Sequence, residues 1–232
     1  RHIGEDFLEE VHIDNKINGQ ITRETKLRYQ LISSHSARRS FATINTLRNI
    51  ISSMIGPMIT ATIKFQIYDL KKQYLEPGLF LEQLNNRLEQ FFRGTENDYF
   101  VTAFYGVLDL EQRTFLYSNA GHSAPGLYTG NRLELLDNDH GLPLGILPDM
   151  PYDQKQVQLN IGDELFLYTD GIFELALLGK EAKTCSSIHE LFDTDAPVTI
   201  LQLRQLKEEI LTWVSKEQIA DDINYISIEL LS

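Results

Sequence analysis

Two acidic turns stand out among the residues that could do chemistry. Asp170 follows an apolar run that predicts a strand, and Gly171 after it frees the backbone for a turn. Asp221 and Asp222 stand just before a second alternating run, residues 224–230. Carboxylates at neighbouring strand ends can hold a hard divalent cation such as Mg²⁺ or Mn²⁺. The alternative for each is an ordinary polar turn.

The charge balance excludes one class of partner. The 232 residues include 33 Asp and Glu against 21 Lys and Arg, which gives a net charge of −12. Binding to nucleic acid draws on clustered Lys and Arg, so we expect no nucleic-acid partner. The single cysteine, Cys185, excludes an internal disulfide and suits a reducing, cytoplasmic location.

The chain shows no division and no membrane segment. No linker or low-complexity stretch interrupts it, so we expect one domain over residues 1–232. The longest uncharged run, residues 49–63, contains Gly56-Pro57 and falls short of the roughly 20 apolar residues of a membrane span. The chain begins at Arg1 rather than Met, so we expect a fragment of a longer regulatory protein.

The elements that must position the two acidic turns are mostly strands. The predicted strands are residues 6–14, 27–33, 100–110, 114–119, 126–128, 133–136, 154–159, 164–169 and 224–230. The predicted helices are residues 79–92, residues 198–214 and a kinked helix from Ser36 to about Leu75, with an apolar stripe from Ile44 to Ile59. Antiparallel sheets covered by helices give an α+β fold.

An ordered series of motifs carries a family resemblance. In chain order the motifs are Leu-Asp-Leu at 108–110, Tyr-Ser-Asn-Ala-Gly-His at 117–122, Gly-Leu-Pro-Leu-Gly-Ile at 141–146, Thr-Asp-Gly at 169–171 and Ala-Asp-Asp-Ile at 220–223. The series is dense from about Asp98 to the C-terminus. It closely resembles the SpoIIE/RsbU family, a bacterial branch of the type 2C (PPM) metal-dependent serine/threonine phosphatases.

The resemblance implies a layered β-sandwich flanked by helices, with a two-metal site at one end of the sheets. Carboxylates of the family hold two Mn²⁺ or Mg²⁺ ions, and a metal-bound water attacks phosphoserine or phosphothreonine. Such an ion pair activates the water and neutralises phosphoryl charge, so that no protein nucleophile is needed. The partner implied is a phosphorylated regulatory protein similar to an anti-sigma-factor antagonist.

The family's metal ligands can be carried over residue by residue. Asp170 and Asp221 match two ligands, with Asp222 beside the second. Asp6 matches the acid of a Gly-Gly-Asp-Phe element near the start of the chain. Glu9 stands where a further aspartate is common and is another candidate ligand.

One position departs from the family. Its Asp-Val-Ser-Gly-His-Gly motif ends the second strand and opens a long helix, and its aspartate bridges both metals. The matching segment is Leu-Ile-Ser-Ser-His-Ser at 31–36, which puts Leu31 at the bridging position. A leucine cannot bind a cation and leaves the repulsion between two dications uncompensated. We expect weak binding of one ion or none.

Two functions stay open. The first is a pseudophosphatase, which keeps the fold and uses it to bind a phosphoprotein or to form a homodimer without turnover. The second is an active Mn/Mg-dependent phosphatase. Leu31 favours the first and the C-terminal motifs favour the second. His35 and His122 could serve acid–base chemistry or bind metal, but a structural role at a helix start and in a turn is favoured for them.

Overall fold

The computed structural model describes part of the chain. The described residues are 15–17, 20–30, 41–49, 65, 66, 70, 75–93, 99–109, 111–136, 141–168, 173, 198–214 and 224–231. The chain forms two compact units, each assembled from separate segments. Unit 1 comprises Arg1–Glu10, Ser34–His122 and Asp139–Gln158, and unit 2 comprises Val11–Ser33, Ser123–Asn138 and Leu159–Ser232. The single domain over residues 1–232 stays a prediction.

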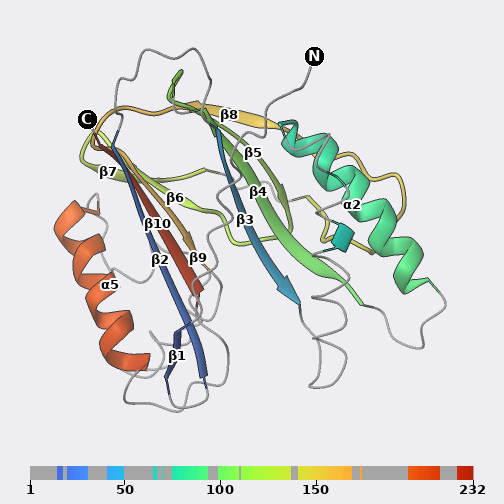
Figure 1. The fold of residues 1–232 in the computed structure, drawn as a ribbon, viewed down its shortest axis with the longest axis horizontal. Coiled ribbons are helices and arrows are strands. Elements are labelled where there is room, and N and C mark those ends of the chain that lie inside the picture. The colour runs from blue at the N-terminus through green and yellow to red at the C-terminus, as the bar shows by residue number, and fades with distance from the viewer. Residues whose placement is uncertain are drawn as a thin grey trace, which may run out of the picture. The chain divides into compact units, whose positions relative to one another are not determined.

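Unit 2 is built on a six-stranded sheet (Figure 1). In spatial order its strands are β1 (Asn15–Ile17), β2 (Gln20–Gln30), β10 (Asn224–Leu231), β9 (Glu164–Tyr168), β6 (Gly126–Thr129) and β7 (Arg132–Leu135). β10 runs parallel to β2, and the other neighbouring pairs are antiparallel. All residues of β9 are buried, as expected of a central strand that is covered on both faces.

In the described part of unit 2, residues Ile200–Val214 form the helix α5, which is coloured orange in Figure 1. Its Leu203 is fully buried, and Val198 just before the helix is nearly so. These two side chains remove apolar surface from water at the start of the helix, which stabilises its attachment.

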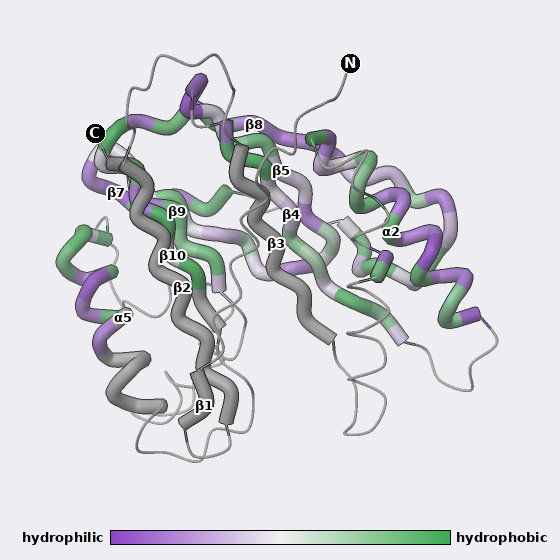
Figure 2. Tube along the Cα trace, in the orientation of Figure 1, coloured by the Kyte–Doolittle hydropathy of each residue, from purple (hydrophilic) through white to green (hydrophobic). Residues whose placement is uncertain are grey.

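Unit 1 is built on a four-stranded antiparallel sheet and one long helix. The strands, in spatial order, are β3 (Phe41–Asn49), β4 (Val101–Asp109), β5 (Thr114–Ala120) and β8 (Lys155–Gln158). The helix α2 (Pro77–Phe92) alternates hydrophilic and hydrophobic residues along its length (Figure 2). Its apolar side packs on β4, where the rings of Phe80 and Tyr105 stack with centroids 4.0 Å apart.

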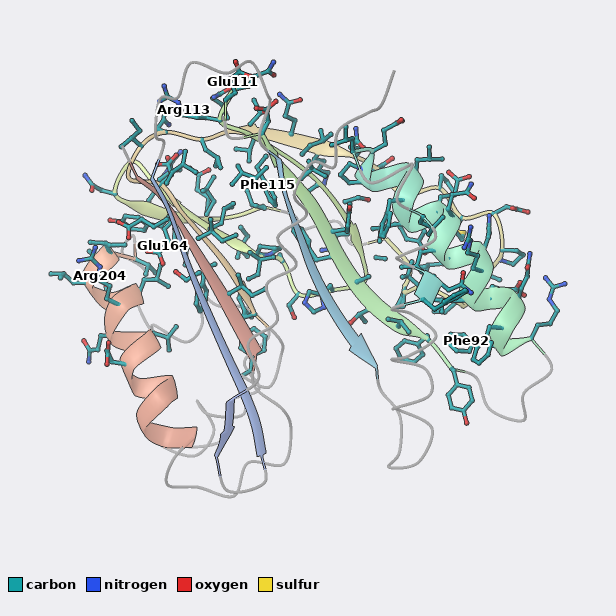
Figure 3. All side chains as sticks on the ribbon, viewed as in Figure 1. Phe92, Glu111, Arg113, Phe115, Glu164 and Arg204 are labelled. Carbon is teal, nitrogen blue, oxygen red and sulfur yellow. The ribbon has the colours of Figure 1, made fainter. Side chains whose placement is uncertain are left out.

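The hairpin between β4 and β5 closes through a side chain. The Asp109 carboxylate accepts hydrogen bonds from the backbone N–H groups of Glu111 and Gln112, at 3.0 and 2.8 Å. Arg113 completes the turn with a φ of 55°, and Figure 3 shows Glu111 and Arg113 at its tip. An aspartate that bonds backbone amides two and three residues ahead is a common way to make a turn. The predicted hairpin is confirmed.

Most predicted elements are confirmed within two residues of their predicted ends. They include the strands from residue 100 onward and the two helices predicted at 79–92 and 198–214. β2 begins at Gln20, well before the predicted start at residue 27, because its first three residues pair with β1 and the next ones, from Arg23 on, pair with β10. The strand predicted at 6–14 lies outside the described residues.

The helix predicted from Ser36 is wrong over residues 41–49, which form β3. The spacing of Ile44 and Leu47 suits a helix, but the segment Phe-Ala-Thr-Ile-Asn-Thr-Leu-Arg-Asn is rich in β-branched residues, which favour strands. All nine positions pair with β4 from Phe41↔Asp109 to Asn49↔Val101. The apolar pattern is compatible with a helix or a strand, and the pairing with β4 makes this segment a strand. Ser36 itself and residues 50–64 lie outside the described residues.

Two asparagines of α2 hold the segment that contains the Gly-Leu-Pro-Leu-Gly-Ile motif. The buried Asn85 donates to the backbone carbonyl of Leu147 at 2.8 Å and accepts from the Gly145 N–H at 2.9 Å. The more exposed Asn86 donates to the side-chain carboxylate of Asp149 at 3.3 Å and accepts from the Asp149 backbone N–H at 2.7 Å. Phe92, labelled in Figure 3, leaves no room for a Cβ at Gly145, whose φ is +89°.

We predict that Asn85→Ala lowers the free energy of unfolding by about 2–3 kcal/mol, because it removes a fully buried amide together with its hydrogen bonds to the Leu147 carbonyl and the Gly145 N–H. Asn86→Ala is the matched control, since it removes a similar pair of bonds where water can replace them, and it should cost about 0.5–1 kcal/mol. Urea unfolding of both variants measures the difference. Equal losses would show that burial at Asn85 contributes nothing.

Candidate metal centre

The two acidic turns flank neighbouring strand ends in unit 2. β9 and β10 are antiparallel, and Tyr168 at the end of β9 lies opposite Tyr225 at the start of β10. Asp170 follows Tyr168 by two positions, and Asp222 precedes the first residue of β10 by two. The register therefore places Tyr168, two positions before Asp170, and Asn224, two positions after Asp222, at the same end of the sheet. Asp170, Asp221 and Asp222 themselves lie outside the described residues, and the convergence of their carboxylates stays a prediction.

The end of β9 is firmly anchored. The Tyr168 hydroxyl donates a 2.8 Å hydrogen bond to the backbone carbonyl of Ala124, and the side chain is 2% exposed. Its ring also lies against those of Phe166 and Phe173, with centroids 5.7 and 5.6 Å away. A polar tip bonded to backbone and a ring packed among rings fix this side chain in one place.

Gln30, which directly precedes Leu31, lies at the opposite end of the same sheet. Because β2 is parallel to β10, Gln30 pairs with Leu231, six positions along β10 from Tyr225. At about 3.3 Å per residue this separation is roughly 20 Å. Leu31 lies outside the described residues, directly after Gln30. The assignment of Leu31 to the bridging position stays a prediction, and the strand β3 takes the place of the expected helix over residues 41–49.

The remaining predicted ligands are not placed. Asp6 and Glu9 lie outside the described residues, as does His35. Within the described ranges no three His, Cys, Asp or Glu side chains gather closely enough to hold a metal ion. Asp170, Asp221 and Asp222 are carboxylates of the kind that Mn²⁺ or Mg²⁺ prefers, and their assembly into one metal site stays a prediction.

His122 has a structural place. Its N–H donates to the side-chain oxygen of Asn119 at 2.8 Å, and the Asn119 amide donates back to the His122 carbonyl at 2.9 Å. The ring is 3% exposed, with Nδ1 3.2 Å from the Thr102 hydroxyl. These contacts lock the Asn-Ala-Gly-His turn at the end of β5, which agrees with the structural role favoured from sequence.

One buried carboxylate lies away from the acidic edge. Glu164, labelled in Figure 3, starts β9 and is 3% exposed. It accepts a hydrogen bond from the Ser227 hydroxyl. It is paired with Glu229, near the far end of β10 from Tyr225. Glu164 thus lies at the opposite end of β9 from Tyr168, the last described residue before Asp170.

The described part of the chain contains no helix that is both long enough and apolar enough to cross a membrane.

Comparisons of sequence identify a family. The family model described as Stage II sporulation protein E (SpoIIE) matches residues 42–231. The phosphoserine phosphatase RsbU of Bacillus subtilis (strain 168) is 32% identical over 135 residues, which are 53% of this chain and 38% of that protein. The phosphoserine phosphatase RsbP of the same organism is 24% identical over 192 residues, 78% of this chain and 45% of that protein. The chain thus spans less than half the length of either relative.

Comparisons of structure give the fold. The SiaA-PP2C domain of Pseudomonas aeruginosa has a TM-score of 0.63 at 17% identity, covering 81% of this chain and 75% of that one. The PP2C phosphatase domain of Bacillus subtilis SpoIIE, solved with a fragment of its regulatory domain, has a TM-score of 0.55 at 15% identity and covers 83% and 63%. RsbX in complex with magnesium has a TM-score of 0.51 at 17% identity and covers 86% and 91%.

These likenesses confirm the predicted α+β, PPM-type fold. The family match begins at Ala42 and includes Asp170, Asp221 and Asp222, whereas Leu31 precedes it. Because that match extends over most of the sequence, the chain belongs to the SpoIIE/RsbU family of PPM-type phosphatase domains.

Proposed function

We propose that this domain binds a phosphorylated regulatory protein, holds at most one Mn²⁺ or Mg²⁺ weakly, and hydrolyses phosphoserine poorly or not at all. It is in this sense a pseudophosphatase of bacterial phospho-signalling. The proposed ligands are Asp170 and Asp221, with Asp222 beside them. Their support is the register that brings β9 and β10 to one edge.

The observation that carries the proposal is a long stretch of sequence without acidic residues. From Thr25 to Tyr68 the chain contains no Asp or Glu, although 33 such residues occur in the whole sequence. The family's bridging aspartate follows the second strand, and this stretch covers the second half of β2, all of β3 and the residues beyond it. Whichever residue of this stretch is matched to the bridging aspartate, it has no carboxylate, so the missing bridge does not depend on Leu31 alone.

Repulsion between cations explains why the proposed site binds no more than one ion. Two unit charges 4 Å apart repel by about 4 kcal/mol at an effective dielectric of 20, and two dications repel four times as strongly. A bridging carboxylate offsets much of that repulsion. The acid-free stretch instead contains six basic residues, Lys26, Arg28, Arg38, Arg39, Arg48 and Lys64.

The proposed roles follow from the residues present. A bound cation supplies positive charge that neutralises phosphoryl oxygens. Asp170 and Asp221 would hold it through their two carboxylates, which are ligands that Mg²⁺ accepts. Magnesium bound to RsbX, which shares the fold, supports the choice of ion. With no second cation to activate a water between two metals, the phosphate is held rather than hydrolysed.

The proposed partner is a cytoplasmic phosphoprotein similar to an anti-sigma-factor antagonist. Its support is the likeness to RsbU and RsbP, both described as phosphoserine phosphatases. A phosphoserine carries close to two negative charges, which a lone cation can recognise.

An active phosphatase is the second candidate. Asp170, Asp221 and Asp222 are all present, and the strands that carry them are correctly paired. Asp6 or Glu9 would then have to supply the bridge from a distant part of the chain. Counting the bound metal ions separates this candidate from the first.

We predict weak binding of no more than one Mn²⁺ per chain in calorimetry, and loss of that binding in Asp170→Asn. Asp153→Asn is the control, because it removes an exposed carboxylate in unit 1 and should leave the affinity unchanged. Two tight sites per chain would contradict the proposal and would favour a bridge from Asp6 or Glu9.

We predict a turnover number below about 0.01 per second on a phosphoserine protein at millimolar Mn²⁺, far under the usual enzyme range of roughly 1–1000 per second. The reason is that the uncatalysed barrier is very high and the ion pair that lowers it does not assemble. Phosphate release from a phosphorylated antagonist protein measures this. Rapid release that Asp170→Asn abolishes would make the domain a working phosphatase.

A further inference from the structure

One turn of unit 1 exposes apolar side chains where surface turns are normally polar. Ile146 and Leu147 are 44% and 48% exposed, and Pro148 directly after them is exposed as well. Gly, Asn, Asp and Ser are the usual residues of such turns, and a run of three exposed apolar residues is unfavourable unless it serves a function. Residues 146–148 thus form an apolar turn that the fold itself does not explain.

The apolar turn is held in place on both sides. Before it, Leu144 exchanges two backbone hydrogen bonds with the start of β4, at 2.8 and 3.0 Å. Within it, the Leu147 carbonyl accepts from the fully buried Asn85 of α2. After it, the Asp149 N–H donates to Asn86. These bonds use the backbone of the segment, so none of them requires apolar side chains in the turn. A surface that is already fixed loses little conformational entropy when a partner covers it.

Acidic side chains border the apolar turn. Asp149 is exposed and directly follows the turn, and its carboxylate accepts from Asn86 of α2. Glu82 lies one helical turn before Asn86, on the same side of α2. Arg93 lies two helical turns after Asn86, but Glu89 accepts two hydrogen bonds from it, at 3.0 and 2.7 Å, and compensates its charge. The border is therefore negative and complements Lys or Arg on a partner.

The charge decides which partner fits. A second copy of this chain would bring the same acidic border, and each copy carries a net charge of −12. Like charges that face each other across an interface are unfavourable. A partner protein with apolar side chains surrounded by Lys or Arg matches both the apolar turn and its border, since interfaces combine an apolar centre with a polar rim.

We infer that the apolar turn docks a partner protein through apolar side chains flanked by Lys or Arg, in a contact that involves neither phosphate nor metal. This inference adds a docking surface to the proposed function, and only the identity of the partner as the phosphoprotein rests on that function. Such a contact is useful there, because a chain of charge −12 repels a phosphorylated partner.

A synthetic helical peptide with Leu on one face and Lys on both sides of it is the probe, in buffer without metal. Fluorescence anisotropy measures its affinity for the full chain. The double variant Ile146→Ser/Leu147→Ser should weaken binding by about tenfold, because the apolar centre of the contact is lost. Glu82→Gln should weaken it by about two- to threefold, because one charge of the border is lost.

Ile161→Ser is the matched control and should leave the affinity unchanged. Ile161 is 51% exposed in a turn of unit 2, but its neighbours are Asn160 and Gly162, so it stands alone. Equal affinities of the control and the double variant overturn the inference, as does equally tight binding of a peptide with Glu in place of Lys. Sedimentation showing a dimer that the double variant abolishes would assign the turn to a second copy and also overturn it. Since the probe carries no phosphate, its failure to bind leaves the proposed function standing.

Discussion

The antiparallel pairing of β9 with β10 is the interaction on which the candidate centre depends. It joins a strand that precedes one acidic segment to a strand that follows the other, although Tyr168 and Tyr225 are far apart in sequence. Every residue of β9 is buried, so a slip by one position would turn Phe166 and Tyr168 to the wrong face. Packing thus enforces the register that the chemistry requires.

In the proposed function, the number of acidic residues and not the fold limits how many metal ions the site binds. The sheet, its register and the carboxylates of the C-terminal motifs are those of a metal-dependent phosphatase domain. What the sequence lacks is negative charge in the stretch from Thr25 to Tyr68. In the proposed function, this loss of negative charge limits the domain to one weakly bound cation. A domain of this kind can keep recognition of a phosphorylated partner when hydrolysis is lost.

Sequence alone could predict the elements whose signals are local. The hairpin at Asp109, the helix α2 and the strands β9 and β10 follow from turn residues and periodicity, and the ordered motifs predicted the family. The segment 41–49 could not be assigned in this way. Its apolar spacing fits a helix and its β-branched residues fit a strand, and the pairing with β4 decided between them.

The anchoring residues were also beyond sequence reasoning. Tyr168 bonds a backbone carbonyl 44 residues away, and Asn85 bonds a backbone amide 60 residues away. Backbone partners leave no mark in the residue types at either position, so no pattern could have signalled these contacts. Tyr168 reads in sequence as one more apolar residue of a buried strand.

Electron paramagnetic resonance of the full chain in excess Mn²⁺ tests the central claim most directly, because two Mn²⁺ ions that share a bridge are magnetically coupled and an isolated ion is not. The account predicts the spectrum of a single uncoupled ion in at most one site per chain, which Asp170→Asn abolishes. The spectrum of a coupled pair would show that the chain supplies the bridging ligand after all, and would contradict the account.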